Sequence, residues 1–188
     1  MTERGMIFNA EMVRAILDGR KTQTRRIIKL SHERGMLNPV VRGRNGEISS
    51  ITCRLAPTLC PLGQPGDHIW VRETFGDCGE RLVYRADTDD GAKCKVKRWT
   101  PSIHMPRWAS RILLEITDVR VEQLQAITLG DICKEFGCGL YDFRPATYGF
   151  QAWEVLWKSI YGDDSWQANP WVWVIEFKRI EGDGHETD

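Results

Sequence analysis

The residues best suited to chemistry lie together near the N-terminus, in segment 19–26, which reads Gly-Arg-Lys-Thr-Gln-Thr-Arg-Arg. A threonine hydroxyl such as that of Thr24 can act as a nucleophile when a base lies within hydrogen-bond reach. Lys21 could supply that base if burial and nearby cations lower the pKa of its amine toward neutrality. Arg26 adds a planar fork of donors for an anion or a carbonyl oxygen. The other candidate ligand contacts in this segment are Arg20 and Arg25.

A predicted helix must deliver this segment. Asn9 is a suitable N-cap, an apolar stripe follows over 12–17, and Gly19 has the usual position after a helix C-terminus. Residues 21–28 then favour a strand. On a regular strand Lys21 and Thr24 would point to opposite faces, because side chains alternate. The two can act together only if the chain bends just after Gly19 or if Lys21 precedes the regular strand. A solvated edge strand without a ligand is the alternative.

The rest of the chain alternates short strands with two further helices. Strands are predicted over 47–52, 67–73, 82–86, 112–121 and 171–177, and helices over 128–137 and about 147–160. This pattern predicts an α+β fold built on a small β-barrel of about five to seven strands, flanked by about three helices. We expect one domain over residues 1–180, with loop insertions at about 31–62 and 87–108. The polar tail, 181–188, is expected to be disordered.

Composition narrows the choice of partners. The chain has 188 residues with 26 basic and 26 acidic side chains, so its formal net charge is zero. Overall charge therefore argues neither for nor against nucleic acid, and only local clusters can do so. No apolar run approaches the roughly 20 residues needed to cross a bilayer, and the N-terminus has no apolar signal core. We expect a cytoplasmic protein without a membrane partner.

The six cysteines and four histidines show no metal-binding spacing, because no C-x-x-C pair and no H-x-x-x-H element occurs. We therefore expect neither a metal nor another cofactor. The alternative is a zinc site assembled in three dimensions from four cysteines. Those cysteines are Cys53, Cys60, Cys78 and Cys94.

A second cluster of cations lies between Gly91 and Leu114, in a stretch that contains no acidic residue. Tryptophans are interleaved with the basic side chains, and that combination suits phosphate contact with base stacking. A solvated charged loop is the alternative. The candidate nucleic-acid contacts in this stretch are Lys95, Lys97, Arg98, Trp99, Arg107 and Trp108.

Four blocks of sequence, in the same order, resemble the ASCH domain family, which is related to PUA domains. Segment 19–26 is similar to the family's G-x-K-T-x-T-x-R signature. Residues 63–73, Gly-Gln-Pro-Gly-Asp-His-Ile-Trp-Val-Arg-Glu, are similar to its G-D-x-x-x-V barrel strand. Residues 112–121 and 171–177 are similar to the next strand and to the closing strand. The long form, with its stretch Pro-Ser-Ile-His-Met-Pro-Arg-Trp-Ala-Ser-Arg over 101–111, resembles proteins encoded by phages and prophages.

The resemblance implies an RNA- or nucleoside-binding protein with its ligand in a cleft beside a PUA-like barrel. One branch of the family is similar to amidohydrolases that remove the acetyl group from N4-acetylcytidine with a Lys, a Thr and a Glu. By position these roles fall on Lys21, Thr24 and Glu135. The helix that carries Glu135 is the weaker part of the match, and Glu73 is the rival for that role.

Three functions stay open at this point. The first is hydrolysis of an N4-acylated cytidine at the Lys, Thr and Glu just named. The second is a non-catalytic nucleic-acid-binding module, in which the Lys and the Thr only form hydrogen bonds. The third is a metal-dependent ribonuclease that uses Glu73 or Glu135. Trp70, Arg72 and Glu73, from the block that resembles the family's barrel strand, are further candidate ligand contacts.

Overall fold

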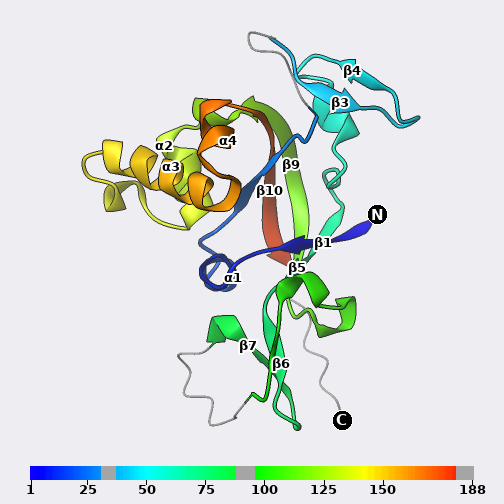
Figure 1. Cartoon of the computed structure of the whole chain (residues 1–188), viewed down its shortest axis with the longest axis vertical. Coiled ribbons are helices and arrows are strands. Elements are labelled where there is room, and N and C mark those ends of the chain that lie inside the picture. Colours follow the sequence, from blue (N-terminus) through cyan, green and yellow to red (C-terminus); the bar gives the residue numbers. More distant parts are fainter. Residues whose placement is uncertain (31–36, 88–95, 181–188) are drawn as a thin grey trace.

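A computed structural model describes residues 1–30, 37–87 and 96–180 (Figure 1). Within these residues lie ten β-strands in three sheets and four α-helices, so the predicted α+β class is confirmed. Lys95 and the tail over 181–188 fall outside the described residues. None of the helices in the described part is long and apolar enough to cross a membrane.

A five-stranded sheet forms the centre of the molecule, in the order β1-β5-β9-β10-β2. Its strands are β1 (Glu3–Ile7), β5 (His68–Arg72), β9 (Leu113–Gln123), β10 (Trp171–Ile180) and β2 (Gln23–Ile27). β1 runs parallel to β5, and the other neighbours are antiparallel. β1 and β2 are the two edges, and within the described residues the five strands do not close into a barrel by backbone pairing.

Strand β10 is buried on both faces because each face meets a different hydrophobic core. Val172 and Val174 pack with tryptophans of a helix on one side. The alternate residues Trp173 and Ile175 belong to the larger core on the other side. The nearly continuous apolar run of this segment is typical of a strand with two buried faces.

The four helices are α1 (Ala10–Leu17), α2 (Leu129–Phe136), α3 (Thr147–Tyr161) and α4 (Asp163–Gln167). Asn9 caps α1 as predicted, because its side chain accepts a hydrogen bond from the Met12 N–H at 2.8 Å. Gly19 follows that helix with a φ of 71°. Thr128 caps α2, and Gly137 ends it with a φ of 70°. The chain therefore leaves both α1 and α2 through a glycine in the left-handed conformation.

Two smaller sheets lie at opposite ends of the molecule (Figure 1). One is the hairpin of β3 (Val40–Arg42) and β4 (Ile48–Ser50). The other has the order β7-β6-β8, with β6 (Phe75–Asp77), β7 (Leu82–Tyr84) and β8 (Trp99–Thr100). The predicted strand over 47–52 is therefore present as β4, whereas β3 and β8 are short strands that were not predicted in the two segments expected to be loop insertions.

Candidate ligand-binding site

Lys21 lies in a turn between α1 and β2. The backbone N–H groups of Arg20 and Lys21 both donate to the carbonyl of Ala15, at 2.8 and 2.9 Å, so the chain turns directly after Gly19. The regular strand begins only at Gln23. Lys21 therefore precedes the strand, which is one of the two arrangements that allow it to act together with Thr24.

The side chain of Lys21 ends on the last turn of α2. Its Nζ atom donates to the carbonyl oxygen of Glu135 at 2.6 Å and to the carboxylate Oε2 of the same residue at 3.0 Å. The Lys21 side chain is completely buried, and the Glu135 side chain is 4% exposed. Arg20 pairs with Asp18 and donates to the carbonyl of Gly137 at 2.6 Å. Both cations thus bind carbonyls that a helix C-terminus leaves without intrahelical partners.

Thr24 and Glu135 line a common small cavity of about 20 Å³, which Met12 and Trp153 also border. Thr24 is 2% exposed and pairs with Ile175 of β10. Lys21 does not border this cavity. A cavity of this size has room for about one water molecule. Glu135 is therefore the residue that connects the three, since it binds Lys21 directly and borders the same cavity as Thr24.

Arg25 extends the ion pair into a buried network of charges. Its guanidinium lies 3.1 Å from Glu135 Oε1 and 3.0 Å from Glu122 Oε2. It also lies 3.4 Å from Asp131, which Arg120 contacts at 3.0 Å. Every charge of the network has a partner of opposite sign, as burial of ions requires.

Burial lowers the pKa of Lys21 below its ordinary value, while the Glu135 carboxylate opposes this change. A lowered pKa favours the neutral amine, which is the form that a general base needs. The contact of 3.0 Å allows a proton to pass between Nζ and Oε2. The pair can therefore serve as a base and proton carrier for a nucleophile in the small cavity.

Glu73 belongs to a different ion-pair cluster. Arg111 contacts both of its carboxylate oxygens, at 2.9 and 3.1 Å, and also pairs with Asp87. Arg72 lies over the ring of Trp70, at 5.4 Å from the centroid. None of the three predicted contacts from the strand over 67–73 borders the small cavity. The structure thus unites Lys21 with Glu135 and leaves Glu73 with a separate cation.

The described part of the basic stretch lies at the end of the molecule that holds β6 and β7, away from α2 (Figure 1). Trp99 is half-buried, and the guanidinium of Arg85 lies 5.2 Å above its ring. Arg107 pairs with Glu3 at 2.8 Å. The exposed residues with no such partner among the described residues are Lys97, Arg98 and Trp108. The structure does not join this stretch to the Lys21 network.

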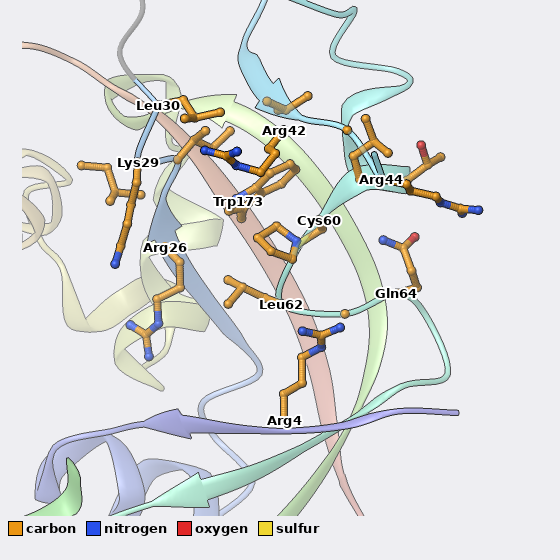
Figure 2. Close-up of a pocket in the computed structure, with 18 of the residues that line it drawn as sticks. Arg4, Arg26, Lys29, Leu30, Arg42, Arg44, Cys60, Leu62, Gln64 and Trp173 are labelled. Atoms are coloured by element: carbon orange, nitrogen blue, oxygen red, sulfur yellow. The ribbon is translucent and has the colours of Figure 1, made fainter. Parts of the chain in front are cut away.

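A much larger pocket, of about 950 Å³, lies between strand β2 and the segment 41–64. Figure 2 shows Trp173 of β10 and Leu62 in its middle, with cations around them. Val41, Leu59 and Cys60 add to its apolar lining. The cations that border it come from distant parts of the chain, and they are Arg4, Arg26, Lys29, Arg42 and Arg44.

Among the described residues, none of these five cations forms an ion pair with a carboxylate. Arg42 donates to the carbonyl of Gly46 at 3.2 Å. Arg26 donates to the carbonyl of Ile7 at 2.7 Å and lies 5.3 Å from the centre of the Phe8 ring. The other three have no hydrogen-bond partner within the described part of the chain. Positive charge in this pocket is therefore available to a ligand.

Asp67 is the one carboxylate among the described residues that line the pocket. Its two oxygens accept hydrogen bonds from the backbone N–H groups of Thr2, at 2.7 Å, and Gln64, at 3.1 Å. The hydrogen bond from Thr2 lowers the pKa of Asp67. Asp67 is thus ionised, but backbone N–H groups bind both of its oxygens. The cations that line the pocket therefore outnumber its carboxylate, although the net charge of the whole chain is zero.

Two residues, Arg26 and Tyr161, border both the large basic pocket and the small cavity. The cavity of Thr24 and Glu135 therefore adjoins the pocket, and Arg26 stands between them. Arg26 was predicted as a ligand contact. The other four cations of the pocket were not, because they lie at positions 4, 29, 42 and 44 with no shared periodicity. The two arginines of the segment Arg42-Gly43-Arg44 are the strongest local signal that could have indicated these cations.

Within the part of the chain that the structure describes, no group of three or more His, Cys, Asp or Glu side chains is placed to hold a metal ion. Cys53 and Cys60 are free thiols. Burial raises the pKa of Cys60 to about 11. The zinc alternative also needs Cys94, which lies outside the described residues.

No family model and no curated protein matches the chain. Among solved structures, it is similar to the crystal structure of protein EF3133 from Enterococcus faecalis V583, described under the family model DUF984. The two chains are 8% identical, the match covers 100% of this chain and 87% of the other, and the TM-score is 0.46. A likeness of this size supports no conclusion about the family or the function of the chain.

Proposed function

We propose that the chain binds RNA or a nucleoside and hydrolyses the acyl group of an N4-acylated cytidine, with Lys21, Thr24 and Glu135 as the reacting residues. The observation that carries this proposal is the buried contact of 3.0 Å between Lys21 Nζ and Glu135 Oε2, beside a cavity that Glu135 shares with Thr24. The resemblance of segment 19–26 to the ASCH signature supports the same assignment.

The proposal includes the fold and setting that the resemblance implies, a PUA-like barrel of an ASCH domain of phage or prophage type, acting in the cytoplasm. The hydrogen bond of Arg26 to the Ile7 carbonyl supports the barrel, because it links the two edge strands, β2 and β1. A sheet whose edges meet through one side chain is strongly curved.

In the proposed reaction the Thr24 hydroxyl, or a water molecule in the cavity, attacks the acyl carbon. The Glu135 carboxylate, which borders the cavity, accepts the proton of the nucleophile and passes it to the neutral Lys21 amine through their contact of 3.0 Å. The guanidinium of Arg26 stabilises the negative charge that develops on the acyl oxygen. The carbon–nitrogen bond then breaks, the cytosine amine receives the proton, and water releases the carboxylic acid from Thr24 if the hydroxyl was the nucleophile.

A non-catalytic nucleic-acid-binding module is the second candidate. It is favoured by the complete burial of Lys21, whose two hydrogen bonds both go to Glu135, and by the unpaired cations of the large pocket. The metal-dependent ribonuclease has less support, because lysine or arginine already neutralises the carboxylates of Glu73 and Glu135.

The test is release of cytidine from N4-acetylcytidine by the purified protein. We expect turnover, and we expect Thr24→Ala to lower kcat/KM by about 100-fold or more, because it removes the nucleophile or its anchor. Thr22→Ala is the matched control, since Thr22 lies two residues away and contributes backbone hydrogen bonds to this region. An unchanged melting temperature in both variants excludes unfolding as the cause.

Absence of turnover across a panel of N4-acylated cytidines, with the protein shown to be folded, would make the hydrolase proposal wrong. Equal loss in Thr24→Ala and Thr22→Ala would also count against it. The binding module would then be the remaining candidate.

A further inference from the structure

We infer that the large basic pocket holds a single-stranded nucleic acid with several phosphates, and that this strand, rather than a free nucleoside, is the ligand of the chain. The inference rests on the proposed function for the reaction at Thr24, but it makes a claim about binding that stands on the pocket itself.

The charge of the pocket is the first reason. Five cations and one occupied carboxylate border it among the described residues, so like charges gather there without internal compensation. A nucleoside carries no charge that could neutralise them. A chain of phosphates carries one negative charge per nucleotide and releases counterions when cations bind it.

The size and shape of the pocket are the second reason. Its volume of about 950 Å³ is at the upper end of the range for small-molecule sites and exceeds what one nucleoside fills. In Figure 2, Arg4 and Arg44 lie on different sides of the apolar centre formed by Trp173 and Leu62. Cations along the rim with an apolar floor between them suit a strand whose backbone follows the rim and whose bases contact the floor.

The connection to the small cavity is the third reason. Arg26 and Tyr161 border both spaces, so a strand in the pocket can present one base toward Thr24. Proteins that act on a base commonly take that base out of a single strand or out of the stack. The pocket would then bind the flanking nucleotides while one cytosine lies beside Arg26, where the pocket adjoins the small cavity.

Fluorescence anisotropy with a labelled single-stranded RNA of about eight nucleotides tests the inference. We expect binding that weakens with salt, with a slope of log K against log salt of about −2 to −3.5, because single strands give about −0.7 for each neutralised phosphate. Unlabelled cytidine should not compete, and the unlabelled RNA should compete fully.

Arg42→Gln combined with Arg44→Gln is the variant that identifies the site. We expect it to weaken RNA binding about 10-fold or more and to reduce the salt slope by about one or more. Arg54→Gln is the matched control, because Arg54 is exposed in the same segment but does not line the pocket. It should change affinity by less than about twofold.

The outcomes separate this inference from the proposed function. RNA binding that is lost in the double variant, without hydrolysis of acylated cytidine in any context, supports the strand site and makes the hydrolase proposal wrong. Hydrolysis of free N4-acetylcytidine that the double variant leaves unchanged, with no RNA binding, overturns the strand inference and leaves the hydrolase proposal standing. RNA binding reduced equally by Arg54→Gln and the double variant also overturns the strand site.

Discussion

The buried network around Glu135 and the large basic pocket adjoin each other but differ in how their positive charges are neutralised. Lys21 and Arg25 are completely buried, and each has a carboxylate partner at about hydrogen-bond distance. Arg42 and Arg44 are exposed at the large pocket and have no carboxylate partner among the described residues. Buried charges must be neutralised internally, because desolvation is costly. Charges left unpaired at a pocket instead remain available to an external anion.

This difference implies that the Glu135 network contributes to stability and the large basic pocket to ligand binding. The network around Glu135 is part of the folded structure, so its residues should affect stability as well as any reaction. The exposed cations Arg42 and Arg44 of the pocket have no carboxylate partner among the described residues, so they should add little to the fold and affect mainly binding. Arg26 belongs to both, since it borders both cavities and also joins β2 to β1.

The largest effect is expected from Glu135→Ala. This change removes the shared partner of Lys21 and Arg25 and leaves Lys21 buried without a carboxylate. We expect the free energy of unfolding to fall by about 3–5 kcal/mol, measured by urea denaturation. Glu154→Ala is the control, because Glu154 forms a partly exposed pair with Lys158 on α3, and its loss should cost about 0.5 kcal/mol or less.

If Glu135→Ala lowers the free energy of unfolding by less than about 1 kcal/mol, the claim that the Glu135 network is part of the folded core would be wrong. It would mean that water or another group reaches Lys21 when Glu135 is absent. The network would then be better described as part of an open site than as part of the core.

A smaller effect, with a characteristic pH dependence, is expected from Lys21→Met. The cost near neutral pH should be about 1–3 kcal/mol, because the hydrogen bonds to Glu135 are lost while Arg25 still neutralises that carboxylate. The pKa of Lys21 is lowered by burial in the folded chain. Between that lowered value and the ordinary lysine pKa, the unfolded chain binds more protons than the folded chain.

The stability of the wild type should therefore rise with pH across this window, and Lys21→Met should lack that rise. The difference in the free energy of unfolding between the two proteins should grow as the pH rises toward the ordinary lysine pKa of about 10.4. Urea titrations of both proteins at several pH values give this difference directly, and other titrating groups cancel in it. A difference that stays constant or shrinks with pH would show that burial does not control the charge of Lys21.

Local signals in the sequence were enough to predict the helix and the turn that place Lys21, but they did not predict the large basic pocket. Asn9 and Gly19 bound the first helix as expected, because capping depends on residues within a few positions. β1 was missed, since the residues over 3–7 are mostly exposed and only Met6 is buried. An edge strand that pairs with β5 far along the chain leaves no periodic apolar pattern to detect.

The candidate site shows the same division. Lys21 and Thr24 came from a contiguous signature, and Glu135 came from its position before Gly137. The wider ion-pair network around Glu135 could not be predicted, because Arg25 and Glu122 meet only after β2 and β9 are placed in one sheet. The basic stretch over 97–108 was found from its composition, but composition could not show that Arg107 pairs with Glu3.

The smallest effect on stability is expected at the other end of the comparison, in the pocket. Arg42→Gln with Arg44→Gln removes two cations that have no carboxylate partner among the described residues, so no favourable ion pair is lost. Their removal also relieves repulsion from the remaining cations of the pocket. We expect the free energy of unfolding to change by no more than about 0.5 kcal/mol in either direction, although the same variant should lose most of its RNA binding.

A loss above about 1 kcal/mol, measured by urea denaturation without ligand, would show that these arginines hold the β3–β4 hairpin in place. The charge of the pocket would then be a requirement of the fold, and the contrast with the Glu135 network would fail.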